Sequence, residues 1–290
     1  SFMNDLHDLI NPHQMQYYSY YDDLMIPFFE ARDTTLDRRV VTCVYSGENL
    51  IYTEPFDFTA NGYSREHTYC HSWMPTYPAQ SLPEYSDFHH LFPSNLNSAN
   101  ILRSNNPLGE VVNVTTSFLG CKSGTNSTGQ TVFEPRDNHK GDAARAIMYQ
   151  AICYNSINGN NWALPSNQDQ MILKEWHFQD PPDNWEIARN DFIDSLDGMT
   201  LRDIEQSIKL SRQTSPTLDY EKLIYLYKYG KKTSPWEELS KDKLKDTESI
   251  LRERVKGQDE AIRKVRDVII RAYSGLSGIE HSGSQSKPAP

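Results

Sequence analysis

The chain has 290 residues, of which 37% are hydrophobic and 23% charged, so its composition is that of a globular protein and argues against disorder. The net charge of −10 is uneven: residues 1–200 hold 11 Lys and Arg against 25 Asp and Glu, and residues 201–290 hold 18 against 14. The acidic part argues against a general nucleic-acid coat protein, which binds by neutralising phosphates, but not against an enzyme with one local basic groove.

The expected location follows from three absences in the sequence. No apolar run is long enough to span a bilayer, and the first residues lack the basic and apolar regions of a signal peptide. Four cysteines at irregular spacing do not predict a disulfide framework. We therefore expect no membrane partner and a cytoplasmic location.

The hydrophobic pattern predicts the following elements in chain order. Residues 5–30 have helical spacing, and residues 40–45 form a short buried strand that Ser46-Gly47 ends. Residues 120–130, rich in Gly, Ser, Thr and Asn, predict a mobile loop.

Helices dominate the prediction beyond residue 139. They span residues 140–154, 185–196, 239–255 and 258–276. In the last of them an apolar stripe recurs every three to four residues: Ala261, Val265, Val268, Ala272 and Leu276. A polar connector at residues 211–219 precedes these C-terminal helices, and a Ser, Gly and Pro-rich tail at 277–290 is expected to be disordered.

Two segments, residues 63–73 and 87–111, gather the groups that phosphodiester hydrolysis needs. Glu66 and Asn100 can supply the oxygen ligands that a hard cation such as Mg²⁺ prefers. His67 suits a general base that is neutral near pH 7, so activity is expected to fall below about pH 6.5, the ordinary pKa of histidine. Arg103 can stabilise the extra negative charge of the transition state.

Glu66 and His67 are sequence neighbours, which poses a geometric problem. Neighbouring residues on a regular strand point to opposite faces, so both can reach one phosphate only near a strand end or a distortion. We expect such an irregularity at this position.

Other interpretations of these residues stay open at this stage. Glu66, His67 and the pair His89-His90 can each have a structural role, and Asn100 can be a helix cap or turn residue. His67, Cys70 and His71 offer zinc ligands, although no matched second pair follows downstream.

Several ordered motifs resemble the endonuclease I family of His-Me finger (ββα-metal) nucleases. The first comprises Arg65-Glu66-His67 and Ser72-Trp73, and the second runs from Asp87 to Ser94. Later matching segments begin at Arg103, Glu134, Lys140, Trp176 and Glu186. The resemblance spans about residues 5–200.

This resemblance implies an α+β domain in which a small antiparallel sheet and a helix hold one divalent ion, Mg²⁺ or Mn²⁺. It assigns the general base to His67 and the metal ligands to Glu66 and Asn100. Relatives of this kind cut DNA, and often RNA, with little sequence preference and leave 5′-phosphates.

Three basic residues within the matching motifs are assigned to substrate phosphate: Arg65, Lys140 and Arg145. The sequence also departs from the family pattern, because Cys70 stands where a proline is usual. The spacing before Arg103 is one residue longer than in close relatives, which leaves Asn97 as a rival of Asn100. After the Asn-Asp helix the usual family tail is replaced by residues 196–201.

A second resemblance covers residues 236–290, which are similar to the entry helices of a Clp-type AAA+ ATPase module. The matching run begins at Leu251-Arg252-Glu253-Arg254-Val255 and includes Gly257-Gln258-Asp259-Glu260-Ala261. The Gly-rich phosphate loop of such modules is absent from this sequence, so the chain itself is not expected to hydrolyse ATP. Two amphipathic helices of an ordinary bundle are the alternative.

The sequence therefore predicts a nuclease domain at residues 1–200, a helical connector at 201–238, the first helices of an AAA+ module at 239–276, and a tail. We expect a metal-dependent endonuclease acting on DNA, self-associated through the C-terminal helices, as the effector of an ATPase-linked defence against phage. The alternative is a catalytically degenerate module that recognises nucleic acid or protein for an ATP-driven unfoldase.

Overall fold

A computed structural model describes residues 2–10, 16–33, 38–52, 56–155, 163–196, 199–200, 202–203, 206, 244 and 246–273. The chain forms two compact units, Ser1–Ile208 and Lys209–Pro290, and each is described by itself. The predicted connector at 211–219 and the predicted tail at 277–290 lie outside the described residues.

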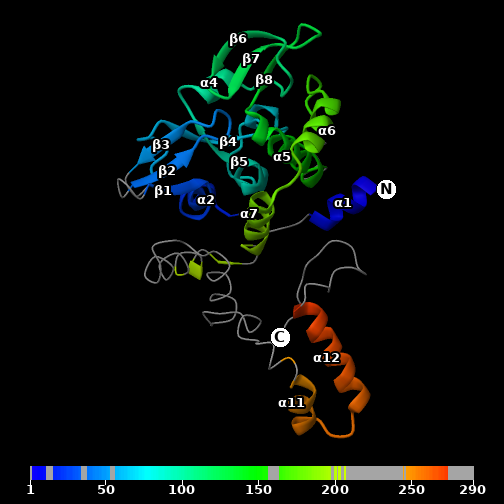
Figure 1. Cartoon of the computed structure of the whole chain (residues 1–290). Helices are drawn as coiled ribbons and strands as arrows, with labels where there is room; N and C mark the ends of the chain where they lie inside the picture. Colours follow the sequence, from blue (N-terminus) through cyan, green and yellow to red (C-terminus); the bar gives the residue numbers. More distant parts are fainter. Residues whose placement is uncertain are drawn as a thin grey trace. The chain divides into compact units, whose positions relative to one another are not determined.

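Three small antiparallel sheets form the framework of the first unit (Figure 1). The first sheet contains β1 (Glu30–Asp33), β2 (Arg38–Thr42) and β3 (Asn49–Tyr52). The second is the pair β4 (Tyr63–His67) and β5 (Leu91–Asn95). The third contains β6 (Asn113–Phe118), β7 (Cys121–Thr125) and β8 (Thr131–Glu134).

Helices surround these sheets. The α-helices of the first unit are α1 (Phe2–Ile10), α2 (Tyr21–Phe29), α3 (Pro83–Ser86), α4 (Ala99–Arg103), α5 (Lys140–Cys153), α6 (Gln170–Gln179) and α7 (Asn184–Ser195). Short 3₁₀ turns are η1 (Tyr18–Tyr20), η2 (His71–Trp73), η3 (Phe88–His90) and η4 (Asp137–His139). Helices α5 and α6 pack side by side (Figure 1). The mixed α+β architecture agrees with the prediction.

The pair β4–β5 and the helix α4 form a compact hairpin-and-helix unit. The strands pair antiparallel in unbroken register, with Tyr63 opposite Asn95 and His67 opposite Leu91. Asn95 then turns the chain toward α4, because its Oδ1 accepts hydrogen bonds from the backbone N–H groups of Asn97 and Ser98. This turn brings α4 against β5.

The structure corrects the prediction of a mobile loop at residues 120–130. Strand β7 occupies residues 121–125 of this range and pairs with β6 and β8, and a turn follows it. Gly124 is needed there because a Cβ at this position would lie 2.0 Å from the carbonyl oxygen of Asn113 on β6. Strand β7 has an exposed neighbouring strand, and short polar side chains suit such a position. Judged by composition alone, the same residues resemble a loop.

The other predictions for the first unit differ mainly at their boundaries. The single helix expected at residues 5–30 is divided into α1, η1 and α2. The strand expected at 40–45 ends at Thr42, and the following residues form a turn. The helices predicted at 140–154 and 185–196 are confirmed as α5 and α7, and α6 was not predicted.

The second unit is described mainly through two helices, α11 (Thr247–Arg254) and α12 (Asp259–Tyr273). They lie within the two predicted C-terminal helices and contact each other. Ile262 of α12 is buried, whereas Val265 and Val268 of the predicted stripe are 47% and 51% exposed. In both units, none of the helices that could be described has the length and apolarity needed to cross a membrane.

Candidate metal and catalytic site

Glu66 is the carboxylate at the centre of the hairpin-and-helix unit. It lies on β4 and is 7% exposed. Its Oε2 accepts a hydrogen bond of 2.8 Å from Nδ2 of Asn100 on α4, and its Oε1 accepts one of 3.3 Å from the hydroxyl of Tyr45. Burial raises the pKa of Glu66 to about 7, although Arg103 and these two hydrogen bonds act in the opposite direction.

Tyr45 reaches this carboxylate from a different part of the chain, the turn between β2 and β3. Its ring is fully buried and contacts Phe133 and His139 edge to face. Its carbonyl accepts a hydrogen bond from the backbone N–H of Arg136. Tyr45 is therefore fixed from both sides while its hydroxyl faces Glu66.

Arg103 is completely buried and acts electrostatically on the same carboxylate. Its guanidinium lies 5.0 Å from the ring centre of Trp73 and 5.9 Å from that of Phe133, and Nη2 donates a hydrogen bond to the carbonyl of Thr68. Nε and Nη1 have no hydrogen-bond partner among the described atoms. Arg103 is thus buried, and its charge lowers the pKa of Glu66 against the effect of burial. The predicted role of Arg103 in stabilising the transition state stays a prediction.

His67, the last residue of β4, has a different environment. Its Nε2 donates a hydrogen bond of 2.8 Å to the carbonyl of Tyr85, and its ring stacks on Tyr18. No hydrogen bond to Nδ1 is found among the described residues. With the proton on Nε2, Nδ1 carries the lone pair that a general base uses.

The electrostatic state of His67 is set by burial among these rings. Burial lowers its pKa to about 4, although the hydrogen bond to Tyr85 opposes this shift. The imidazole is therefore neutral at pH 7. The sequence predicts that the neutral form of His67 is lost below about pH 6.5. The fold corrects this expectation, because burial keeps the imidazole neutral at lower pH.

The predicted irregularity at Glu66 and His67 is not found in the strand pairing. Glu66 is opposite Phe92 and His67 is opposite Leu91, and Thr68 continues the ladder by bonding to His90. The two side chains lie in separate surroundings, as regular alternation requires. His67 is the last residue of β4, so the pair does stand at a strand end, which was the other condition stated for both to reach one phosphate.

The donors around Glu66 fit a divalent cation. The nearest atoms of Glu66 and Asn100 are 2.8 Å apart, close to the spacing of about 2.9 Å between adjacent ligand oxygens around octahedral Mg²⁺. Rotation of the Asn100 amide by half a turn presents Oδ1 in place of Nδ2. A bound cation would also compensate the buried charge of Glu66, which Arg103 offsets only in part. Asn97, the rival ligand, is exposed and lies against Gly62.

The zinc alternative gains no support from this geometry. Among the residues that the structure describes, no three His, Cys, Asp or Glu side chains gather closely enough to hold a metal ion. Burial also raises the pKa of Cys70 to about 12, whereas zinc binds the thiolate.

The three basic residues assigned to substrate phosphate have internal partners. Arg65 forms a bidentate ion pair with Asp22 at 2.6 Å. Lys140 pairs with Glu134 and Asp137, and Arg145 pairs with Asp142 and Glu186. A phosphate role for these three side chains stays a prediction, and their contacts give each one a structural role.

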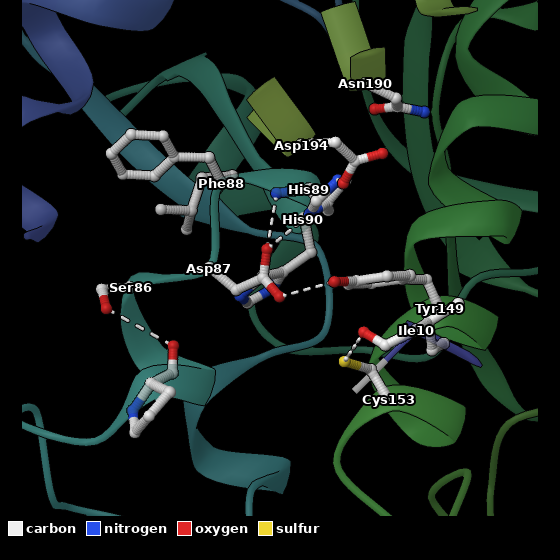
Figure 2. A network of polar contacts seen from close by, with 12 residues as sticks. Ile10, Ser86, Asp87, Phe88, His89, His90, Tyr149, Cys153, Asn190 and Asp194 are labelled. Atoms are coloured by element: carbon white, nitrogen blue, oxygen red, sulfur yellow. Dashed lines mark hydrogen bonds and ion pairs between the residues drawn. The ribbon is translucent and has the colours of Figure 1, made fainter. Parts of the chain in front are cut away.

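The second motif is organised around Asp87, which is fully buried (Figure 2). Its Oδ1 accepts hydrogen bonds from the backbone and from Nδ1 of His89, and its Oδ2 accepts them from the hydroxyls of Tyr149 and Tyr154. Nε2 of His89 lies 3.3 Å from Asp194 on α7. This network joins the segment before β5 to α5 and α7.

Arg189 of α7 completes that connection. It is buried, and its Nη2 donates to the carbonyls of Phe88 and Leu91 at 2.6 and 3.0 Å. The hydroxyl of Tyr21 donates to the same carbonyl of Leu91 at 2.8 Å. The start of β5, opposite His67, is thus held by side chains from both ends of the domain.

Sequence reasoning missed Tyr45, Tyr18 and Tyr85, which surround the two central side chains. Tyr45 ends an apolar run before Ser-Gly, and nothing in that local pattern distinguishes a residue that binds a carboxylate from a core residue. Tyr85 contributes its carbonyl oxygen, which every residue type has.

Two paired strands followed by a helix thus place a buried carboxylate beside an amide, with a neutral imidazole at the end of the strand. The chain matches the model of the Endonuclease I family over residues 2–200 and belongs to that family. No solved structure matches the chain.

Curated relatives include two ribonucleases. The chain is 38% identical over 71 residues to the extracellular ribonuclease of Bacillus subtilis (strain 168), which is 21% of this chain and 25% of the relative. It is 35% identical over 71 residues to the extracellular ribonuclease of Bacillus amyloliquefaciens, with the same shares covered. The match thus spans about a quarter of the length of each relative.

Proposed function

We propose that the chain is a divalent-metal-dependent endonuclease that hydrolyses phosphodiester bonds at a His-Me finger site made by β4, β5 and α4. The hydrogen bond between Asn100 and Glu66 is the observation that carries this proposal. It joins the two predicted metal ligands from a strand and a helix that are 34 residues apart in sequence.

Each residue of the site has a defined task in this proposal. Glu66 and Asn100 hold Mg²⁺ or Mn²⁺, which when bound stabilises negative charge on the phosphate and the leaving oxygen. His67 takes a proton from the attacking water at Nδ1, while its Nε2–H stays bonded to the carbonyl of Tyr85. Arg103 lowers the pKa of Glu66 from within the core and so favours its ionised form.

The proposed substrates are DNA and RNA. The two relatives in Bacillus are named ribonucleases, which supports RNA, and the family resemblance supports DNA. No base-reading motif was found in the sequence, so the enzyme is proposed to cut with little sequence preference. The product is proposed to carry a 5′-phosphate.

The test is cleavage of supercoiled plasmid and of a labelled RNA by the purified full chain in Mg²⁺, in excess EDTA, and after Mn²⁺ is added back. The proposal requires cleavage with metal, none in EDTA, recovery with Mn²⁺, and 5′-phosphate ends that a phosphatase removes. Cleavage that continues in EDTA would contradict it.

A catalytically degenerate recognition module is the second candidate, and the acidic balance of residues 1–200 is the observation in its favour. Such a module would bind nucleic acid or protein without cutting in either metal. The intact set of Glu66, Asn100 and His67 supports the enzyme instead.

The second unit is proposed to assemble copies of the chain. The exposure of Val265 and Val268 on α12 supports self-association. The family match ends at residue 200 and does not include the C-terminal helices. We therefore propose from the sequence alone that the chain is linked to an ATPase, acts in phage defence and is cytoplasmic.

A further inference from the structure

A continuous group of aromatic rings leads from His67 to the surface. His67 contacts Tyr85 at 4.5 Å between ring centres, Tyr85 contacts His71 at 4.6 Å, and His71 contacts Tyr77 at 4.9 Å. We call these four residues and Tyr18, which stacks on His67, the aromatic ridge. Tyr77, at its outer end, is 57% exposed.

The ridge is assembled from three segments of the chain: η1, the stretch from β4 to residue 77, and α3. None of its five residues is an Asp, Glu, Lys or Arg. The ridge is thus an aromatic surface that begins at the proposed general base and ends in solvent.

The charges around the site do not favour binding through phosphates alone. Arg65, next to Glu66, is paired with Asp22, and Arg145 and Lys140 are paired with carboxylates. Residues 1–200 hold 25 acidic and 11 basic side chains. A polyanion bound here needs a source of affinity other than surface cations, and the ridge offers stacking, worth about 1–3 kcal/mol per base.

We propose that the aromatic ridge is a subsite for an unstacked nucleobase beside the cut phosphate, with Tyr77 as the stacking side chain, so that the preferred substrate is single-stranded nucleic acid. In a duplex both faces of each base are covered by its neighbours, so only a single strand presents a face to Tyr77. The inference rests on the proposed function, which places the phosphate at Glu66 and His67.

The cleavage test compares Tyr77→Ala with Tyr77→Phe, which keeps the ring. Phe178→Ala is the matched control, since Phe178 is 69% exposed on α6 and has no described contact with the ridge. The substrates are a single-stranded oligonucleotide, as DNA and as RNA, and the duplex of the same sequence, all in Mg²⁺.

The expected result is a KM for single strands that rises about 5- to 150-fold in Tyr77→Ala, with kcat unchanged. Tyr77→Phe and Phe178→Ala keep the wild-type values, and duplex cleavage does not respond to any of the three substitutions. A rise confined to RNA or to DNA identifies the strand type. Equal losses on single strands and duplex, or no loss, overturn the proposal.

A binding measurement separates this inference from the proposed function. Fluorescence anisotropy of the labelled single strand, recorded in EDTA with wild type and Tyr77→Ala, needs no cleavage. Weaker binding by Tyr77→Ala supports the ridge even if the chain cuts nothing. In a series of oligonucleotides that each lack one base, the affinity should fall for only one position of the missing base. An affinity that is the same for every oligonucleotide of the series contradicts the ridge.

Discussion

Asn100 donates a 2.8 Å hydrogen bond to the carboxylate of Glu66, and this contact links the strand β4 to the helix α4 that follows the hairpin. Both side chains are directed to one point because the unbroken register of β4 and β5 and the turn at Asn95 fix the helix against the strands. The site is thus defined by a short continuous piece of the fold.

The first prediction concerns metal affinity. Glu66→Ala and Asn100→Ala should each weaken Mn²⁺ binding by at least the roughly 10–100-fold that follows loss of a supporting partner. Asn97→Ala removes a nearby amide that lies against Gly62 and should bind Mn²⁺ like the wild type. Isothermal titration calorimetry measures all three; equal losses in Asn97→Ala and Asn100→Ala would contradict the assignment.

The second prediction concerns stability and pH. The pKa of Glu66 is raised from 4.5 to about 7 in the folded protein, so this group favours folding at low pH and loses that contribution as pH rises toward 7. In EDTA, Glu66→Gln should therefore increase the free energy of unfolding at pH 8 by up to about 3 kcal/mol, and much less at pH 5.

Urea denaturation at the two pH values measures that difference. A Glu48→Gln variant is a carboxylate control, since Glu48 lies in the turn before β3 and accepts a hydrogen bond from Asn95. If Glu66→Gln were destabilising at pH 8, or equally stabilising at both pH values, the buried charge of Glu66 would not be the cause of the change in the free energy of unfolding.

The third prediction concerns Arg103. Arg103 is buried against Trp73 and Phe133, and its charge offsets that of the buried carboxyl of Glu66. Arg103→Ala should therefore lower stability by about 3–5 kcal/mol, as expected when a buried charge loses the group that compensates it. Cleavage should slow on all sequences alike, since Arg103 acts through Glu66. A changed set of cut sites would indicate that Arg103 contacts bases instead.

The helices α5 and α7 follow from the sequence, because helical periodicity is a local property of the residues concerned. The closeness of Glu66 and Asn100 was expected only from the family resemblance of the motifs that contain them, since the two residues are 34 positions apart. By contrast, β7 was missed because Gly124 and its Ser and Thr neighbours have the composition of a loop, and only the closeness of Asn113 on β6 explains the glycine.

The properties of His67 could not be predicted either. Its low pKa comes from burial against Tyr18 and Tyr85, which lie 49 residues before and 18 residues after it in sequence. The contact of Tyr45 with Glu66 depends in the same way on the packing of a distant turn. Such effects come from tertiary structure, which no local pattern records.

The fourth prediction concerns the second unit. Deletion of residues 236–290 should leave the nuclease domain folded and able to bind Mn²⁺, and should shift the chain toward monomer. The double variant Val265→Glu/Val268→Glu should do the same, because it places charges on the exposed apolar face of α12. Lys264→Ala, on the same helix, is the control for a charge change.

Light scattering after gel filtration measures these masses. Aggregation or unfolding of the deletion variant would mean that the helices belong to the nuclease core. An unchanged mass in the double variant would exclude α12 as the association surface.

The last prediction tests the central claim, that His67 is the general base beside a metal held by Glu66 and Asn100. His67→Ala should bind Mn²⁺ with wild-type affinity but cut plasmid about 10²–10⁴-fold more slowly. Because burial lowers the pKa of His67 to about 4, the base stays neutral as pH falls through 6.5.

The most direct measurement is therefore the single-turnover rate of plasmid nicking from pH 5 to 8 in saturating Mn²⁺, for wild type and His67→Ala side by side. The account predicts a large rate loss in His67→Ala at every pH, and a wild-type rate that shows no histidine titration near pH 6.5. Equal rates for the two proteins would contradict it.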